Sequence, residues 1–330
     1  MPLTAEHLLP HPGVQSRWVR LPNGANCHYM TAGDTGPAVV LLHGGIQGSS
    51  GLAGWGRWMM PALAQAGFRV YAPDQPGFGL SDTRPEFRPR HGVLDHVEFV
   101  KQFVNVMELD QFHLSGNSMG ATNTAHFVVD YPERVLSYIL IATYLQPELG
   151  LDPDGSKRAK LGGITIPPWD GTAEGMGRMM ELIIVRKEGI SADLKEMRAY
   201  MGNLQKESYG EFLKSRERIQ ADPNLKQKWM LKNRLENLTI SALYLYGQLD
   251  VLIPVAAGHE QEDYLKNMQF FYPANTGHQG QTDTPELHNK VYIEFFKTGK
   301  VSRKTAEEAG ISKRRPELKH LVEQGAVAAG

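Results

Sequence analysis

The sequence of 330 residues contains a single cysteine, Cys27. One cysteine excludes an intrachain disulfide and a metal cluster built from cysteine ligands, and it suits a reducing compartment. The chain also lacks an uninterrupted run of 18 apolar residues, and its first residues do not pair a basic segment with an apolar one. We therefore expect a cytoplasmic protein that does not associate with a membrane.

Charge of one sign is not in excess, because 35 lysine and arginine residues face 36 aspartate and glutamate residues. Such a balance produces no global field that would favour nucleic acid as a partner. A further absence concerns the glycine-rich segment His43–Gly48, which contains no Gly-x-Gly-x-x-Gly pattern and is followed by no Gly-Lys-Ser/Thr. We expect no cofactor, no metal and no nucleic acid, and a small-molecule substrate.

What the sequence does contain is an alternation of apolar, strand-like runs with helical patterns. Tight-turn residues at Asn23-Gly24 predict a hairpin over residues 16–32. Alternation of the later segments implies parallel strands joined by right-handed crossovers. The predicted strands cover residues 39–42, 68–72, 111–114, 136–142, 238–246 and 268–273, and the predicted early helices cover residues 59–66 and 93–108.

The alternation stops in the middle of the chain, where a Gly/Pro-rich lead-in is followed by helical stretches rich in methionine. The sequence thus predicts an α/β core in two parts, residues 1–145 and 233–298, around a helical lid at 146–232. Residues 299–330 form a charged C-terminal extension, which we interpret as solvated or partly ordered. A subunit contact is the alternative for this extension, and the sequence leaves homo-oligomerisation open.

An apolar run beginning at Gln111 leads into a serine bracketed by glycines, Gly116-Asn117-Ser118-Met119-Gly120, and then into a helical pattern. A Gly-x-Ser-x-Gly pattern permits a strand-to-helix turn so sharp that the serine is strained and its neighbours must be small. The turn lifts the Ser118 hydroxyl to a helix N-terminus, where developing negative charge is favoured. The pattern alone is weak, because three fixed positions in five recur by chance.

Two further residues strengthen the prediction because each follows a predicted strand. Asp250 comes after the strand at 238–246, and His278 comes after the strand at 268–273. Open α/β sheets place their ligands beyond the carboxyl ends of strands. A serine hydroxyl needs a base, so His278 is the candidate base and Asp250 the group that orients its imidazole.

The order Ser118, Asp250, His278, together with His43-Gly44, resembles the α/β-hydrolases over nearly all of residues 18–296. This resemblance implies a mostly parallel twisted sheet with helices on both faces and an inserted helical lid. The segment Gly116–Gly120 with His43-Gly44-Gly45 is similar to the meta-cleavage product hydrolases. These enzymes cleave a C–C bond in 2-hydroxy-6-oxo-dienoate compounds from aromatic degradation, so the resemblance implies a carboxylate substrate.

The resemblance also implies roles for individual residues. The backbone N–H groups of Met119 and Gly45 would form the oxyanion hole. Asn117 matches the asparagine that the family has beside its nucleophile. Arg198 falls where the lid arginine of the family contacts the substrate carboxylate. It also borders a predicted apolar helix face, which leaves open that its side chain extends to water instead.

The chain departs from the family pattern at two positions. Gln279 stands where the family has tryptophan after the histidine, and Arg57 replaces an asparagine that follows the oxyanion loop. Both residues are candidates for substrate binding, and both changes concern which substrate binds more than which reaction occurs. The triad does not specify the bond, so a carboxylesterase, lactonase or amidase is the alternative. A ligand-binding protein without turnover is a third hypothesis.

Overall fold

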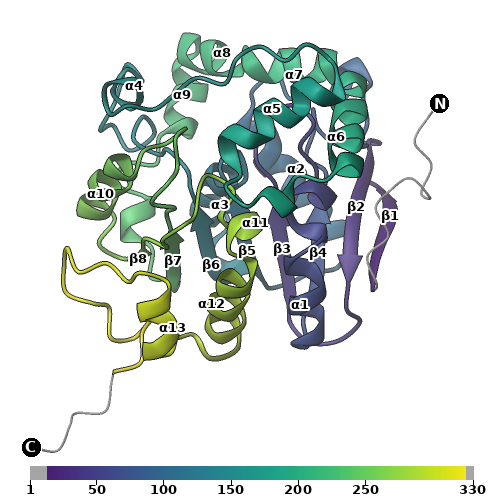
Figure 1. The fold of residues 1–330 in the computed structure, drawn as a ribbon. Helices are drawn as coiled ribbons and strands as arrows, with labels where there is room; N and C mark the ends of the chain where they lie inside the picture. The colour runs from purple at the N-terminus through teal and green to yellow at the C-terminus, as the bar shows by residue number, and fades with distance from the viewer. Residues whose placement is uncertain (1–12, 325–330) are drawn as a thin grey trace, which may run out of the picture.

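The computed structural model describes residues 13–324, and these contain an eight-stranded sheet with the order β1-β2-β4-β3-β5-β6-β7-β8 (Figure 1). β1 and β2 pair antiparallel, as do β2 and β4, and the remaining neighbours are parallel. The hairpin expected over residues 16–32 is confirmed. The strands are β1 Val14–Arg20, β2 Asn26–Ala32, β3 Ala38–Leu42, β4 Arg69–Pro73, β5 Phe112–Asn117, β6 Val135–Ile141, β7 Ala242–Leu245 and β8 Gln269–Phe271.

Helices cover both faces of the sheet, with α1 and α12 on one side and α2 and α3 on the other (Figure 1). The helices of the α/β core up to residue 298 are α1 Met59–Gln65, α2 Val93–Val106, α3 Met119–Asp130, α10 Val255–Tyr264, α11 Gly280–Asp283 and α12 Pro285–Thr298. The two early helices are confirmed to within two residues. β7 is shorter than the predicted strand at 238–246, because residues 238–241, which follow a 3-10 turn at Leu235–Asn237, bend and form no strand. None of the described helices is both long and apolar enough to cross a membrane.

Between β6 and β7 the chain forms the lid, whose helices lie across the top of the sheet in Figure 1. These helices are α4 Lys157–Lys160, α5 Ala173–Ile183, α6 Ala192–Leu204, α7 Lys206–Leu213, α8 Ser215–Ala221 and α9 Pro223–Trp229. Three of them begin at side-chain caps that the sequence encodes, Thr172, Ser191 and Asp222.

The lid rests on loops that follow the central strands. Gln205, at the end of α6, donates from Nε2 to the carbonyls of Phe78, Gly79 and Ser81 at 3.1, 3.3 and 2.8 Å. Gln47 donates from Nε2 to the carbonyl of Gly202 at 3.2 Å. The loops after β3 and β4 therefore carry one side of the lid.

We interpreted the C-terminal extension as solvated or partly ordered, and its described residues are packed against the core. Helix α13, Arg303–Glu308, and the chain after it pack at the β8 edge of the sheet, where Ser312 donates from its N–H to the carbonyl of Phe270 at 3.0 Å. Apolar residues spread thinly among the charges supply the packing, since Val301, Ala306, Ala309, Ile311, Leu321 and Val322 are all buried. Their spacing follows no single period, which is why the sequence pattern did not reveal them.

At the junction of β5 and α3 the backbone of Ser118 takes a φ of 55° and a ψ of −119°. Glycines are required on both sides, because a Cβ on Gly116 would lie 2.1 Å from the carbonyl carbon of Gly120, and a Cβ on Gly120 would lie 2.1 Å from the carbonyl oxygen of Leu42. A non-glycine residue in such a conformation costs about 1–3 kcal/mol. The junction is therefore held by its surroundings against local strain.

Four histidines of the core are buried, and burial lowers their pKa values because the charged imidazolium loses its hydration. The pKa of His126 falls to about 3, and those of His96, His113 and His288 fall to about 4. His96 remains within a polar network behind the elbow, donating from Nε2 to the carbonyl of Pro76 at 2.9 Å. These side chains are neutral in the folded protein at neutral pH.

The strain at Ser118 predicts an inverted order of stability for two substitutions. Ser118→Gly should unfold with a free energy about 1 kcal/mol higher than Ser118→Ala, because only glycine adopts this φ without strain. Urea denaturation of the two variants measures the difference. The same pair at Ser137, in the middle of β6, is the control and should show the usual order, with alanine the more stable. An equal or lower stability of Ser118→Gly would show that the turn is not strained.

The buried histidines predict that the protein loses stability in acid. Their folded pKa values lie below the unfolded value of about 6.5, so their contribution is complete above pH 6.5 and is lost as the pH falls toward 4. From pH 7.5 to pH 5 the free energy of unfolding should fall in both proteins, and it should fall by about 2 kcal/mol less in His126→Leu than in the wild type. His320→Gln, at an exposed position, should leave the loss unchanged. Urea titrations at the two pH values decide the matter.

Candidate active site

Ser118 lies at the N-terminus of α3, at the carboxyl end of β5, and is partly exposed to solvent. Its backbone N–H donates to the carbonyl of Ile141 at 2.8 Å, which fixes the turn against β6. The side chain thus projects from a rigid junction between two buried elements. A hydroxyl held in this way is pre-positioned for attack on a carbonyl carbon.

The structure brings His278 and Asp250 together from the loops after β8 and β7. Nδ1 of His278 lies 2.8 Å from Oδ2 of Asp250, and both side chains are buried. The second carboxylate oxygen, Oδ1, accepts the N–H groups of Leu252 and Ile253, each at 2.9 Å. Asp250 is therefore fixed by the backbone and can hold the imidazole with a proton on Nδ1. Nε2 of His278 is buried and has no hydrogen-bond partner within residues 13–324.

Asn117 connects the elbow with the histidine loop. Its Nδ2 donates to the carbonyl of His278 at 2.8 Å, while its Oδ1 is buried and lacks a partner among the described residues. The sequence placed Asn117 among the substrate-binding residues. In the structure its amide nitrogen holds the backbone of His278, and only its oxygen is available to a ligand.

The glycine-rich loop after β3 lies against the first turn of α3. A Cβ on Gly45 would meet Cβ of Met119 at 2.9 Å, so only glycine allows this approach. His43 stiffens the loop, because its Nδ1 donates to the carbonyl of Gly44 at 2.8 Å and its Nε2 accepts the N–H of Gln75 at 3.0 Å. Burial lowers the pKa of His43, which keeps the ring neutral and able to make both bonds.

Arg198 points inward from α6 and is only 1% exposed, so its side chain does not extend to water. Its Nη2 donates to Oγ of Ser49 at 3.3 Å, and its Nε is buried without a partner within residues 13–324. Burial lowers the pKa of the guanidinium to about 10, and the described residues place no carboxylate within ion-pair distance of it. A buried cation without an anion is costly unless a ligand supplies the negative charge.

The two residues at which the sequence departs from the family pattern behave differently. Gln279 is buried directly after His278, and its Oε1 has no partner among the described residues. Arg57 is exposed, and its guanidinium lies 4.6 Å above the ring of Trp58. The expectation that Arg57 binds substrate is therefore not supported, because its side chain stacks at the surface instead of entering the interior.

Two residues that the sequence did not single out contact the site. Ser49 is the hydrogen-bond partner of Arg198, and Asp283 accepts the N–H of Gly277, next to His278, at 2.7 Å. Neither belongs to a short motif. The one signal was the position of Asp283, five residues after His278 and two residues before a helix that begins at Pro285.

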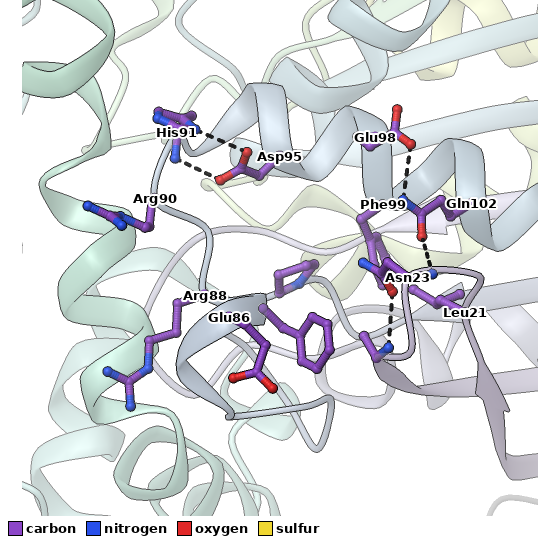
Figure 2. Close-up of a pocket in the computed structure, with 13 residues that line it drawn as sticks. Leu21, Asn23, Glu86, Arg88, Arg90, His91, Asp95, Glu98, Phe99 and Gln102 are labelled. Atoms are coloured by element: carbon purple, nitrogen blue, oxygen red, sulfur yellow. Dashed lines mark hydrogen bonds and ion pairs between the residues drawn. The ribbon is translucent and has the colours of Figure 1, made fainter.

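Two cavities are lined by sequence neighbours of the site residues, although neither is lined by Ser118 or His278. One of about 590 Å³ lies between the lid and Ile46, the neighbour of Gly45, and another of about 230 Å³ reaches Met119 and Thr122. A third pocket, of about 290 Å³, is shown in Figure 2 and lies beside α2. Its polar groups mostly bind one another, as His91 binds Asp95 and Gln102 binds Glu98, so we do not place the active site there.

The chain has recognisable relatives. A sequence model of the alpha/beta hydrolase fold matches residues 37–164. The chain is 28% identical over 287 residues to a 2-hydroxy-6-oxononadienedioate/2-hydroxy-6-oxononatrienedioate hydrolase of Pseudomonas putida, covering 85% of this chain and 96% of that protein. A protein of the same name from Paraburkholderia phymatum is 28% identical over 270 residues, covering 82% and 90%.

A solved structure extends the likeness to three dimensions. The 2-hydroxy-6-oxo-6-phenylhexa-2,4-dienoate hydrolase of a Rhodococcus species superposes with a TM-score of 0.68 at 24% identity, covering 86% of this chain and 99% of that one. The parallel sheet, the elbow after β5 and the helices inserted after β6 agree with these matches. The chain therefore has the α/β-hydrolase fold and resembles the meta-cleavage product hydrolases.

Proposed function

We propose that this chain is a serine hydrolase that cleaves a C–C bond in a ring-cleavage product of the 2-hydroxy-6-oxo-dienoate type. Ser118 is the nucleophile, His278 the general base and Asp250 the residue that orients it. Relatives matching more than four-fifths of the chain carry names of this activity, which supports the assignment. The single cysteine suits a reducing compartment, and we propose that the protein is cytoplasmic.

The observation that carries this proposal is the buried guanidinium of Arg198. It lies under the lid beside Ser49 of the oxyanion loop and lacks an anionic partner among residues 13–324. A carboxylate is the natural complement to it, and a bidentate pair would fix the orientation of the substrate as well as its charge. A simple ester without a carboxylate would leave the guanidinium buried and unpaired.

The proposed reaction begins when the dienol substrate ketonises: the 2-hydroxyl proton is lost and C5 gains a proton, which leaves a C3=C4 double bond conjugated with the 2-oxo group and an isolated 6-oxo group. The Ser118 hydroxyl adds to the 6-oxo carbon while Nε2 of His278 takes its proton, and the backbone N–H groups of Met119 and Gly45 stabilise the oxyanion. The C5–C6 bond then breaks, and its electron pair is delocalised onto the 2-oxo oxygen. Protonation gives the 2-hydroxydienoate, and water releases the acyl group from Ser118 as a carboxylic acid.

The first test uses coloured dienol substrates of the 2-hydroxy-6-oxo type. We expect the wild type to bleach them and to release a carboxylic acid in equal amounts, and Ser118→Ala to lose at least about a thousandfold in kcat. Stopped-flow absorbance and product chromatography measure both. Rapid turnover of p-nitrophenyl esters with no bleaching of any dienol would assign the chain to the ester hydrolases instead.

A second test addresses Arg198. Because a hydrogen bond to a charged group contributes about 1.5–3 kcal/mol, Arg198→Gln should lower kcat/KM for a dienoate roughly tenfold to hundredfold. Turnover of p-nitrophenyl acetate, which carries no carboxylate, should change less than threefold in the same variant. Arg57→Gln is the matched control at an exposed position and should leave both rates unchanged. An equal loss on both substrates would mean that Arg198 supports the fold and does not read the carboxylate.

A further inference from the structure

The linker between α5 and α6, residues 184–191, lies directly against the loop that carries His278. Gln279 donates from its N–H to the carbonyl of Ile183 at 3.1 Å. A Cβ on Gly277 would lie 3.0 Å from Cγ2 of Val185 and 3.3 Å from the Ile183 carbonyl oxygen, so a side chain at residue 277 would push the two segments apart by a few tenths of an ångström. The lid and the histidine loop thus share one packed contact, although they are about ninety residues apart in sequence.

Asp283, the last residue of α11, is the polar centre of this contact. Its Oδ1 accepts the N–H groups of Val185 and Arg186 at 2.7 and 3.0 Å, and its Oδ2 accepts the N–H of Gly277 at 2.7 Å. The residue is 7% exposed. Burial raises the pKa of its carboxyl, and the three N–H donors oppose that shift because they stabilise the ionised form.

The three hydrogen bonds join the lid linker to the loop of His278, and the proposed reaction requires these two segments to keep a fixed relative position. Val185 and Arg186 lead into α6, which carries Arg198, and Gly277 precedes His278. One carboxylate therefore sets the place of the lid arginine relative to the catalytic imidazole. An error of about 1 Å in such a relation can cost roughly a hundredfold in rate.

We propose that Asp283 is a positioning residue that couples the seating of the lid to the placement of His278. This inference rests on the proposed function for its kinetic consequence. When the lid linker leaves Asp283, the loop at 276–279 loses its support at the same time, so the base is correctly placed only while the lid is seated. The other attachment of α6, through Gln205 to the loop after β4, has no contact of this kind with the histidine loop.

The chain supplies variants that separate the coupling from ordinary loosening. Asp283→Asn keeps the shape of the side chain but replaces one accepting oxygen by a donor. Arg186→Pro removes one of the two lid-side N–H donors together with the Arg186 side chain, and the φ of −75° at Arg186 suits proline. Arg186→Ala keeps that N–H and serves as its control. Glu286→Gln removes the exposed ion pair between Arg186 and Glu286, whose closest atoms lie 3.1 Å apart, and controls for surface charge.

The decisive measurement is amide hydrogen exchange of the full-length protein without substrate. In Asp283→Asn and in Arg186→Pro, exchange should rise at least tenfold both at residues 183–187 and at residues 276–279. Gln205→Ala should raise exchange only near residues 78–81 and at the end of α6, and Arg186→Ala and Glu286→Gln should resemble the wild type. Faster exchange at 183–187 with unchanged exchange at 276–279 in Arg186→Pro would overturn the coupling.

Kinetics supply the second readout. On a dienoate substrate, Asp283→Asn and Arg186→Pro should lower kcat/KM about tenfold to a hundredfold, with effects on both kcat and KM, because the base and the lid arginine move together. Wild-type kinetics in both variants would overturn the positioning role. If the wild type hydrolyses no dienoate but the exchange pattern appears as expected, the proposed reaction fails and the coupling stands. If Asp283→Asn does not fold, Arg186→Pro, which leaves Asp283 intact, decides the coupling alone.

Discussion

The left-handed backbone at Ser118 is the constraint on which the site depends. A φ of 55° at this residue turns the chain from a buried strand into a helix without a connecting loop. The turn is possible only because Gly116 and Gly120 leave room for each other and for the end of β3. The strain has a structural use, because the same geometry points the Ser118 side chain away from the sheet and exposes the first N–H groups of α3. Packing of β5 between β3 and β6 keeps the junction in place.

A second feature is a group of polar atoms that the fold buries without a partner. Among the described residues, Oδ1 of Asn117, Nε of Arg198, Nε2 of His278 and Oε1 of Gln279 are all in this condition. A buried polar group without a hydrogen bond costs about 1–3 kcal/mol. These four belong to the elbow, the lid and the histidine loop, and all four were predicted site residues. Stability given up at such positions is typical of sites that a substrate completes.

The sequence predicted those features of the fold and the site that short local patterns determine. The elbow, the strands and the order of the triad follow from short patterns, because a strained turn admits few residue types and a buried strand is continuously apolar. The orientation of Arg198 could not be decided locally, since an arginine at the margin of an apolar helix face can turn either way. Arg57 shows the same limit, because a cation near the oxyanion loop suggests a ligand, whereas in the structure its guanidinium lies over the ring of Trp58 at the surface.

Long-range contacts were out of reach for a different reason. The extension after Gly299 packs through apolar residues without a regular period, and Asp283 acts through backbone N–H groups, which any sequence could supply. A side chain that binds backbone leaves no matching residue type in the partner segment. Such contacts become visible only when the chain is folded, even though they decide how the predicted residues meet.

The lid is attached to the core by polar and apolar contacts. Its contacts with the loops of the core include a few side-chain to backbone hydrogen bonds, from Gln47, Gln205 and Asp283, whereas the strands below are held by complete ladders and a large apolar core. Apolar side chains of the lid, among them Met180, Met197 and Met201, belong to the same apolar core, so an opening of the lid would expose them to water. Arg198 and His278 are both buried under the seated lid. If Arg198 binds the substrate carboxylate, as proposed, the ligand must enter beneath the lid, and pairing with Arg198 would favour the closed state.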